Sequence, residues 1–472
     1  MTTRVHLIGI CGTAMATLAA MLKRKGLDVR GSDADVYPPM SDFLAAEGIP
    51  VFSGYRAEQI THELDLVVVG NAISRGNPEL EEVLDRKIRY CSLPEAIREH
   101  FLWGARSIVL AGTHGKTTTT SLTGWVLAHA GVDPSVLVGG IARNFGEGGS
   151  SYRMGQGRDF VIEGDEYDSA FFDKTAKFLK YLPDIAVINN VEFDHADIYA
   201  DMDAITTAFA RLVRLVPRRG LLLVGGDSPA ALALVDRAVS RVQTFGTTAG
   251  LDWQAHDLVA GPAGTRFHVR RHGLPFGEFD VPLLGAHNVR NALAAIAVAT
   301  EVGIDDMRIR EGLRLFAGVK RRLEVIGVAD GVTVYDDFAH HPTAVAETLN
   351  GLRASHPDAR IWAVFEPRSA SSCRRIFQDD FARAFAAADQ VLIAPVFRST
   401  LPEAERLSVP QLICDLHDAG QQAHAPASVD EIVATLVREH QAGDLVVLMS
   451  NGGFGGIHKR LLAALAPAAP PR

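Results

Sequence analysis

The segment AGTHGKTTT, residues 111–119, has the composition and spacing of a phosphate-binding loop. It lies between an apolar run that predicts a buried strand and a pattern that predicts a helix, which is the setting such a loop requires. Small residues let backbone N–H groups approach phosphate oxygens, and the N-terminus of the following helix adds partial positive charge. Lys116 can reach β- and γ-phosphates, and the Thr117 hydroxyl can bind the magnesium ion that bridges them.

One position departs from the common pattern GxxxxGK[ST], because Leu110 stands where the first glycine belongs. The loop is therefore a shortened GxxGKT form. A glycine-containing turn with a surface lysine is the alternative interpretation. The agreement of strand, glycines, lysine and threonine run favours nucleotide binding over that alternative.

Two further strand-like runs end in clusters of polar residues. The first cluster contains Glu163, Asp165, Glu166 and Asp168, and the second contains Asn189, Asn190, Glu192, Asp194, His195 and Asp197. Ligands of parallel sheets bind at the carboxyl ends of the strands, so we expect both clusters beside the phosphate loop. Carboxylates and an imidazole there suit a second divalent ion, which would hold a γ-phosphate and an attacking carboxylate together. Solvated loop charges are the alternative, and the phosphate loop disfavours it.

The elements that position these residues alternate between strands and helices along the whole chain, which predicts an α/β fold with parallel sheets. The predicted strands include residues 4–10, 27–33, 65–71, 107–112 and 220–227, and predicted helices include one after residue 12 and one beginning at Pro342. The length of 472 residues corresponds to about three domains. We predict them at 1–106, 107–318 and 319–472, with a frayed tail at 463–472.

Composition excludes several classes of protein. The formal net charge of -9 disfavours non-specific binding to nucleic acid. The four cysteines are scattered without a CxxC spacing, which disfavours a disulfide scaffold and a cysteine-based zinc site. No apolar run is long enough to predict a membrane span, and the first residues lack the pattern of a signal peptide. We therefore expect a cytoplasmic protein without a membrane partner.

Read in order, eight segments resemble the Mur ligase family of peptidoglycan synthesis, and the resemblance covers nearly the whole chain. They are VHLIGICGTAM, GNAISRGNPEL, GTHGKTTT, EGDEYD, NNVEFDHAD, GAHNVRNALAA, GVKRRLE and VYDDFAHHPTAV. The resemblance implies three domains: a Rossmann-like N-terminal domain for a UDP sugar, a P-loop ATPase-like central domain for ATP, and a Rossmann-like C-terminal domain for an incoming peptide. A hinge near residues 318–320 is expected, because C-terminal groups must close over the phosphates.

The resemblance also implies roles for individual residues. The implied catalytic residues are Lys116, His195, Arg322, Asp337 and His341, with Arg321 and His340 as near-equal choices for Arg322 and His341. ATP contacts are implied for Gly112, Thr113, His114, Gly115, Lys116, Thr117, Thr118, Asn288 and Asn291, and Mg²⁺ contacts for Thr117, Glu166 and His195. Gly9, Gly12, Asp33 and Ser74 are expected on the UDP side, and Arg368 near the incoming amine.

Two activities of the family compete for this sequence. One joins L-alanine to UDP-N-acetylmuramate, and the other joins the recycled tripeptide L-alanyl-γ-D-glutamyl-meso-diaminopimelate to the same nucleotide sugar. Both are ADP-forming carboxylate–amine ligations that pass through an acyl phosphate. The spellings GICGTAM, FFDKTAKF, EFDHADIY, DDFAHHP, FEPRS and SNGGFGGIH resemble the tripeptide ligases. Pro367, Arg368 and Ser369 stand where alanine-adding members typically have His-Arg-Tyr, which agrees with a larger peptide substrate.

Three other functions remain as alternatives. A nicotinamide dehydrogenase would suit the first strand, glycine turn and Asp33, but Cys11 and Ala14 stand where the GxGxxG fingerprint needs glycine. A regulatory P-loop NTPase would hydrolyse ATP without a carboxylate substrate. A nucleotide-sugar-binding protein without catalysis is disfavoured by intact Lys116, Thr117, Glu166 and His195. Replacing Lys116 with alanine is expected to leave folding intact and abolish ADP release.

Overall fold

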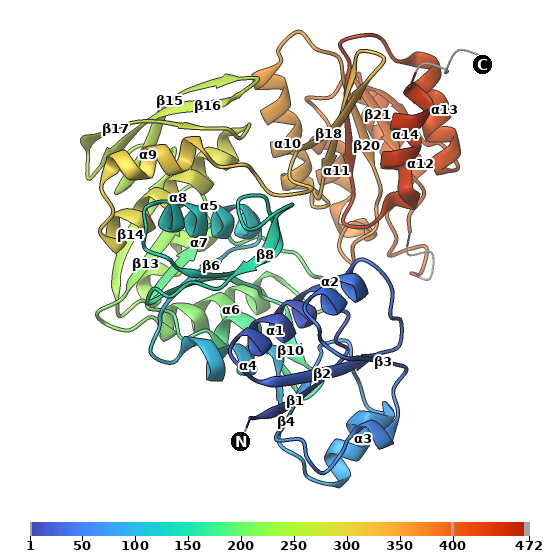
Figure 1. Ribbon diagram of the computed structural model, residues 1–472. Coiled ribbons are helices and arrows are strands. Elements are labelled where there is room, and N and C mark those ends of the chain that lie inside the picture. Colours follow the sequence, from blue (N-terminus) through green and yellow to red (C-terminus); the bar gives the residue numbers. More distant parts are fainter. Residues whose placement is uncertain (1, 398–400, 467–472) are drawn as a thin grey trace, which may run out of the picture.

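The computed structural model describes residues 2–397 and 401–466, which form three domains, each built on its own sheet (Figure 1). The N-terminal domain has a five-stranded, wholly parallel sheet of order β3-β2-β1-β4-β5. Its elements are β1 (Arg4–Ile8), α1 (Thr13–Arg24), β2 (Asp28–Asp33), α2 (Met40–Ala46), β3 (Val51–Ser53), β4 (Leu66–Val69), α3 (Pro78–Asp85), β5 (Tyr90–Ser92) and α4 (Leu93–Ile97). Helices cover this sheet, so β4 is buried along its whole length.

The central domain has a ten-stranded sheet of order β17-β16-β15-β14-β13-β12-β6-β9-β7-β8. Its elements are β6 (Arg106–Ala111), α5 (Lys116–His129), β7 (Ser135–Ala142), β8 (Ser150–Arg153), β9 (Asp159–Gly164), β10 (Asp168–Ala170), β11 (Asp173–Ala176), β12 (Ile185–Ile188), α6 (Met202–Leu215), β13 (Leu221–Gly225), α7 (Pro229–Leu232), β14 (Arg241–Gly246), β15 (Trp253–Gly261), β16 (Gly264–Arg271), β17 (Leu274–Val281), α8 (Ala286–Val302) and α9 (Asp306–Arg314). The strands β9, β6 and β12 are parallel neighbours, so the loops that follow them meet at one sheet edge.

The C-terminal domain has a six-stranded sheet of order β18-β19-β23-β20-β21-β22, parallel except for the first pair. Its elements are β18 (Glu324–Ala329), β19 (Val332–Asp337), α10 (Pro342–Ser355), β20 (Ile361–Phe365), α11 (Gln378–Ala384), β21 (Gln390–Ile393), α12 (Val409–Asp418), β22 (Gln422–His424), α13 (Val429–Glu439), β23 (Leu445–Met449) and α14 (Ile457–Leu465). Helix α10 begins at Pro342, as predicted, because proline is preorganised for the first helical position.

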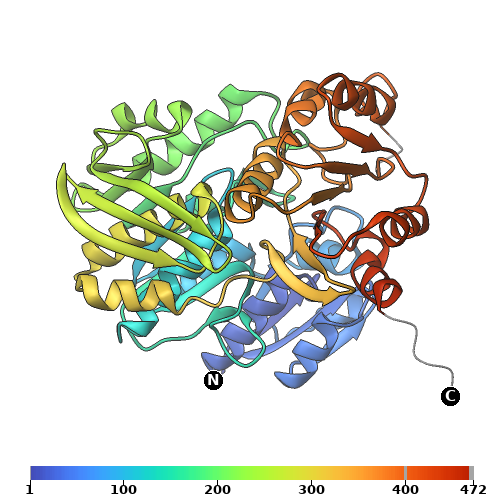
Figure 2. The same cartoon turned by 90° about the horizontal axis from the view of Figure 1, so that it is seen from above.

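The structure corrects two predictions about the sheets. The first strand ends at Ile8 instead of residue 10, because Gly9 turns the chain with a φ of +83°. The prediction of parallel sheets also missed the antiparallel strands β15, β16 and β17, which extend the central sheet at one edge (Figure 2). Their inward residues alternate with exposed ones, as the burial of Phe267 and Val269 in β16 shows.

The three domains contact one another through specific side chains. Thr17 in α1 and Ser151 in β8 share a hydrogen bond of 2.8 Å between the N-terminal and central domains. The segment that was predicted as a hinge is held to the central domain, since Arg143 N–H donates to Gly318 O at 3.0 Å and Lys320 N–H donates to Ile141 O at 2.9 Å. Rotation of the C-terminal domain therefore has to begin after Lys320 or break this pairing.

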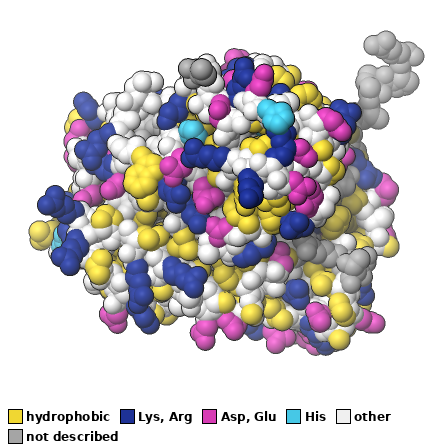
Figure 3. All heavy atoms as spheres, turned by 90° about the horizontal axis from the view of Figure 1, so that it is seen from below, with side chains coloured by type: hydrophobic (Ala, Val, Ile, Leu, Met, Phe, Trp, Pro, Cys, Tyr) yellow, Lys and Arg dark blue, Asp and Glu magenta, His cyan; other side chains and the backbone are white. Residues whose placement is uncertain are grey.

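The surface carries charged side chains of both signs (Figure 3). On the face seen in Figure 3, basic and acidic side chains are intermixed, in keeping with 47 Lys and Arg against 56 Asp and Glu. Among the described residues, none of the helices has the length and apolar character needed to cross a membrane. Of the predicted frayed tail, residues 463–465 belong to α14, and residues 467–472 lie outside the described residues.

Candidate active site

The phosphate loop connects β6 to α5, and two of its glycines have backbone conformations that other residues rarely adopt. Gly112 has a φ of +136° and Gly115, the residue before α5, has a φ of +82°. A Cβ on Gly115 would lie 2.4 Å from Asn291 Oδ1, so this position has no room for a side chain. The turn therefore leaves the first N–H groups of α5 available at a helix N-terminus, where an anion is stabilised.

Lys116, the first residue of α5, is buried against the phosphate loop that precedes this helix. Its Nζ lies 3.0 Å and 2.9 Å from the two carboxylate oxygens of Glu166, and it donates to Gly112 O at 2.8 Å and to Thr113 O at 3.1 Å. Burial lowers the pKa of Lys116, but the charges of Glu166, Asp165 and Glu163 raise it by a larger amount, so the net shift of the pKa is upward. The amine is thus held as a cation beside the loop.

Thr117 is held by the carboxylate that ends β9. Its hydroxyl donates to Glu163 Oε1 at 2.9 Å, and the other oxygen of Glu163 accepts from Gly139 N–H at 2.6 Å. Burial raises the pKa of Glu163, and the charge of Asp165 raises it too. The site therefore holds a surplus of carboxylates whose negative charge a divalent cation would offset. Hydroxyl and carboxylate oxygens are the ligands that Mg²⁺ prefers, so Thr117, Glu163 and Glu166 fit this ion.

The loop after β12 brings an imidazole to the same carboxylate. His195 Nε2 lies 2.8 Å from Glu166 Oε1, and His195 has a φ of +54°. Burial lowers the pKa of His195, while Glu166 and Asp194 raise it by a larger amount. Asp194 itself accepts a hydrogen bond of 2.5 Å from Ser371 Oγ, which belongs to the C-terminal domain. The predicted pair Glu166 and His195 is therefore brought together beside a domain contact.

Two adjacent arginines after the central domain point in different directions. Arg322 donates to Thr117 Oγ1 at 3.2 Å, so its guanidinium reaches the phosphate loop. Arg321 instead donates to Ser450 O at 2.6 Å and to Gly452 O at 2.7 Å, beyond the end of β23. The structure thus favours Arg322 over Arg321 as the group that faces the phosphate loop.

Asp337 is the last residue of β19, and the two histidines lie between β19 and α10. Asp337 accepts from Leu323 N–H at 2.6 Å and from Ala339 N–H at 2.7 Å, and burial raises its pKa although the charge of Arg322 opposes the shift. His341 Nε2 lies 3.1 Å from Phe193 O, while His340 Nε2 lies 3.9 Å from Asp194 Oδ2. Asp337 therefore supports the segment that carries Arg322, and His341 contacts the loop after β12.

Asn288 and Asn291 in the first turns of α8 are buried against α5. Asn291 donates to Asn288 Oδ1 at 3.0 Å and accepts from Thr119 Oγ1 at 3.0 Å. Thr118, in the first turn of α5, is buried as well. The two amides thus lie behind Gly115, and their predicted contact with adenine stays a prediction.

The N-terminal residues predicted on the UDP side gather at the carboxyl ends of β1 and β2. Asp33 accepts from Cys11 N–H at 2.8 Å and from Tyr55 OH at 3.2 Å, so it supports the glycine turn that begins α1 at Gly12. Ser74 is exposed on the loop after β4. That loop reaches the central domain, where Asn71 Nδ2 donates to Asp168 Oδ1 at 3.1 Å. Asp168, a member of the first acidic cluster, is therefore in contact with the N-terminal domain.

Arg368 follows β20 at the carboxyl end of the C-terminal sheet. Its guanidinium lies 3.7 Å from the centroid of the Phe397 ring and 3.6 Å from Glu366 Oε1. Ser369, two residues before Ser371, is buried and bonded to Ser372 at 2.8 Å. The segment Pro367–Ser369 thus leads directly to Ser371, the residue that contacts Asp194.

Family models match three parts of the chain in the order of its domains. A model described as "Mur ligase family, catalytic domain" matches residues 4–102, the "Mur ligase middle domain" matches 110–299, and the "Mur ligase, glutamate ligase domain" matches 321–452. A UDP-N-acetylmuramate–L-alanyl-gamma-D-glutamyl-meso-2,6-diaminoheptandioate ligase of Escherichia coli K12 is 41% identical over 469 residues, which cover 99% of this chain and 99% of the relative. The chain belongs to the Mur ligase family.

Two further relatives place the chain within the Mur ligases. A UDP-N-acetylmuramate–L-alanine ligase of Salinibacter ruber is 37% identical over 455 residues, covering 95% of this chain and 92% of that one. A crystal structure of a murein peptide ligase from Psychrobacter arcticus superposes with a TM-score of 0.71 at 36% identity, covering 99% of this chain and 100% of the other. The predicted family and three-domain α/β fold are thus confirmed.

The sequence did not assign every residue that the structure places in this Mur ligase site. The sequence predicts Glu163 in an acidic cluster but predicts no individual role for it, and in the structure its carboxylate accepts a hydrogen bond from Thr117. Its place at the end of a strand that neighbours β6 was the available signal. Ser371 was not named at all, and no pattern around it points to Asp194.

The burial of His341 makes stability of this Mur ligase sensitive to acid. Burial lowers the pKa of His341 to about 4, and the charge of His114 lowers it as well. The other titratable groups facing it are Glu192, Asp194 and His340. An unfolded histidine has a pKa of about 6.5. Between about pH 6.5 and 4 the unfolded chain therefore binds a proton that the folded chain does not. The folded state consequently loses stability as the pH is lowered through this range.

We predict that His341→Gln reduces the loss of unfolding free energy between about pH 7 and pH 4.5 by on the order of 2 kcal/mol. Denaturant unfolding at each pH measures it. His440→Gln is the control of opposite sign, because the hydrogen bond with Asp330 raises the pKa of His440 and its stabilisation is lost as pH rises. An unchanged acid sensitivity in His341→Gln would contradict the prediction.

Proposed function

We propose that the chain is an ADP-forming ligase that joins UDP-N-acetylmuramate to the tripeptide L-alanyl-γ-D-glutamyl-meso-diaminopimelate. The observation that carries the proposal is the junction at the phosphate loop. There Lys116 and Thr117 contact two buried carboxylates, and Arg322 reaches Thr117 from the start of the C-terminal domain. Such a junction suits transfer of a phosphoryl group, in which positioning and neutralisation of charge supply most of the catalysis.

The reaction proceeds in two steps. The lactyl carboxylate of the nucleotide sugar attacks the γ-phosphorus of ATP, the bond to the β-phosphate oxygen breaks, and ADP leaves. The free amine of the tripeptide then attacks the carbonyl carbon of the acyl phosphate, loses a proton, and inorganic phosphate leaves. Activation is necessary because a carboxylate carries no leaving group. The scheme requires no nucleophilic side chain from the protein.

The side chains act by charge and orientation. Lys116 and Arg322 offset negative charge that develops on the transferred phosphoryl group. Thr117, Glu163, Glu166 and His195 are the residues that would hold Mg²⁺, and the ion would supply positive charge against the phosphates. Asp337 positions the segment that carries Arg322 through its bond to Leu323 N–H. The catalytic assignment of His341 stays a prediction.

The domains divide the substrates between them in this proposal. The glycine turn at Gly9 and Gly12 takes the UDP diphosphate at the N-terminus of α1, where no side-chain cap occupies the N–H groups. Residues 107–318 bind ATP, with Asn288 and Asn291 toward the adenine. Residues 319–472 bind the peptide, with Arg368 near its carboxylates.

Two observations support the tripeptide over L-alanine as the amine. The tripeptide ligases of Escherichia coli and Haemophilus influenzae are 41% and 40% identical, above the 37% of the Salinibacter alanine ligase. Pro367 and Ser369 are smaller than the histidine and tyrosine that alanine-adding members typically have, which agrees with a larger peptide substrate.

The test supplies ATP, Mg²⁺ and UDP-N-acetylmuramate with either L-alanine or the tripeptide and measures phosphate release. We expect release with the tripeptide to be at least about 100-fold faster than with L-alanine, because a site built for the peptide leaves its polar groups unpaired with the smaller amine. Faster release with L-alanine would assign the chain to the sister activity. Turnover of ATP without nucleotide sugar or amine would instead indicate a regulatory NTPase.

A further inference from the structure

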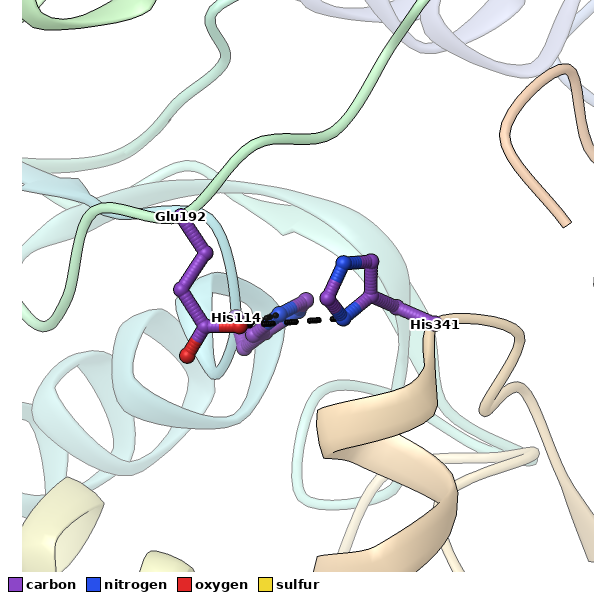
Figure 4. Close-up of side chains that lie close together, drawn as sticks. All are labelled: His114, Glu192 and His341. Carbon is purple, nitrogen blue, oxygen red and sulfur yellow. Dashed lines mark hydrogen bonds and ion pairs between the residues drawn. The ribbon is translucent and has the colours of Figure 1, made fainter. Parts of the chain in front are cut away.

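Three side chains, His114, Glu192 and His341, converge beside the phosphate loop. Figure 4 shows the Glu192 carboxylate directed at the imidazoles of His114 and His341. One ligand atom from each residue lies within 4.8 Å of the other two. His114 Nε2 is 3.4 Å from Glu192 Oε2, and His341 Nδ1 is 3.7 Å from the same oxygen. The residues come from the phosphate loop, the loop after β12 and the residue before α10.

The hydrogen bonds of His341 fix which ring nitrogen is free of a proton. Its Nε2 lies 3.1 Å from Phe193 O, which can only accept, so Nε2 carries the proton. Its Nδ1 then has a lone pair, toward which Thr343 N–H points at 3.3 Å. A metal-binding histidine likewise has one N–H held by a carbonyl and binds through its other nitrogen, so a metal ion at Nδ1 would replace the hydrogen bond from Thr343 N–H.

The other two groups are also held in place from outside the cluster. Thr343 Oγ1 donates to the Glu192 carboxylate at 2.6 Å. His114 N–H donates to Asn190 Oδ1 at 2.8 Å, which fixes the loop that carries the imidazole. Outer partners of this kind orient ligands and tune their affinity for a metal.

The spacing and chemistry of the cluster suit zinc. Bonds of about 2.0–2.1 Å in a tetrahedral zinc site separate neighbouring ligands by roughly 3.3 Å. The two distances to Glu192 are close to this value, and the ligand atoms of the two imidazoles, which lie within 4.8 Å of each other, would move closer on binding. Two imidazoles and one carboxylate favour Zn²⁺ over Mg²⁺. A cavity of about 420 Å³, lined by Glu192, His341, Phe193 and Phe377 among others, gives an ion access and leaves room for a water as the fourth ligand.

We propose that His114, Glu192 and His341 form a site for Zn²⁺ that links the central and C-terminal domains. The site is separate from the oxygen-rich cluster of Glu163 and Glu166. Because two ligands belong to the central domain and the third precedes α10, bound Zn²⁺ holds the two domains in the arrangement seen here. Zn²⁺ therefore restrains the movement of the C-terminal domain that turnover requires.

The test titrates Zn²⁺ into the full-length, nucleotide-free protein in competition with a chromogenic chelator, and repeats the titration with Co²⁺ while recording visible absorption. We expect one Zn²⁺ per chain and the strong visible bands of tetrahedral Co²⁺. His341→Gln and Glu192→Gln should weaken Zn²⁺ binding by more than about 100-fold, and Thr343→Val, which removes only an outer partner, by about 10-fold.

Two control variants show whether Zn²⁺ binds to the proposed cluster or to histidines elsewhere in the chain. His195→Gln and His417→Gln should bind Zn²⁺ as the wild type does. Circular dichroism and thermal melting confirm that each variant is folded, and Thr343→Val keeps all three ligands in case a ligand variant unfolds. Loss of binding in His195→Gln with retention in His341→Gln would overturn the proposal, and so would equal affinity in all variants. ADP formation by the wild type with Mg²⁺ in metal-depleted buffer tests the proposed ligase function separately.

Discussion

Replacing Lys116 with methionine is expected to lower ADP formation by on the order of 10³-fold. Methionine keeps the length and apolar stem of the side chain but removes the amine that lies 3.0 Å and 2.9 Å from the oxygens of Glu166. In the proposed function, the γ-phosphate then loses its positive partner in the phosphate loop. Coupled measurement of ADP, with ATP, Mg²⁺, nucleotide sugar and tripeptide all present, follows the effect.

The structure adds a cost in stability that the sequence did not predict. Lys116 and Glu166 are both buried, and removing one partner of a buried ion pair costs about 3–5 kcal/mol. His195 Nε2, 2.8 Å from Glu166 Oε1, remains as a hydrogen-bond partner of this carboxylate. We therefore expect Lys116→Met to melt at a lower temperature than the wild type.

The double variant Lys116→Met with Glu166→Gln separates the two effects. Glutamine removes the unpaired buried charge, so the double variant should regain part of the lost melting temperature while staying inactive. Near-normal turnover in a folded Lys116→Met protein would contradict the assignment of this residue to the phosphates. A double variant no more stable than Lys116→Met would contradict the charge-pair explanation of the stability loss.

The phosphate loop could be predicted because everything that defines it is contiguous. A buried strand, glycines with positive φ and a helix starting at Lys116 follow one another within residues 106–119, so local physics fixes their order in space. The same holds for the start of α10 at Pro342. The ordered motifs along the chain then identified the family, and the comparisons confirm it.

Contacts between distant segments could not be predicted in this way. Thr117 and Glu163 are 46 positions apart, and Asp194 and Ser371 are 177 apart. Their meeting depends on strand order and on how two domains pack, and neither can be obtained from the spacing of residues in one sequence. The strands β15 to β17, which the sequence analysis did not predict, are a different case. Apolar residues that are buried in the structure alternate with polar residues in their sequence, as in β16.

The choice between Arg321 and Arg322 shows the limit of sequence reasoning at single-residue scale. The two side chains are adjacent and identical, so their type carries no information about which one faces the site. Arg321 has a φ of +60°, and this left-handed turn sends the two guanidinium groups to different partners. One contacts the phosphate loop and the other contacts the carbonyls after β23.

This difference in direction predicts a large difference between two otherwise matched variants. Arg322→Met should lower turnover by on the order of 10²–10³-fold, because it removes a cation that reaches Thr117 Oγ1 at 3.2 Å, beside the place proposed for the transferred phosphoryl group. Arg321→Met should lower turnover far less. Its main effect should be a lower melting temperature, because Arg321 bonds to Ser450 O and Gly452 O within the C-terminal domain.

Steady-state phosphate release and thermal melting of both variants measure this contrast, and Arg322→Lys refines it. Burial lowers the pKa of Arg322, but the charges of Asp337 and Glu163 oppose the shift, and a guanidinium stays protonated at neutral pH. Lysine restores the charge without the planar fork, so it should recover part of the activity lost in Arg322→Met. Equal losses of turnover in Arg321→Met and Arg322→Met would mean that the adjacent arginines act as one basic patch. The direction of the Arg322 side chain, and with it the domain junction proposed as the reacting centre, would then be wrong.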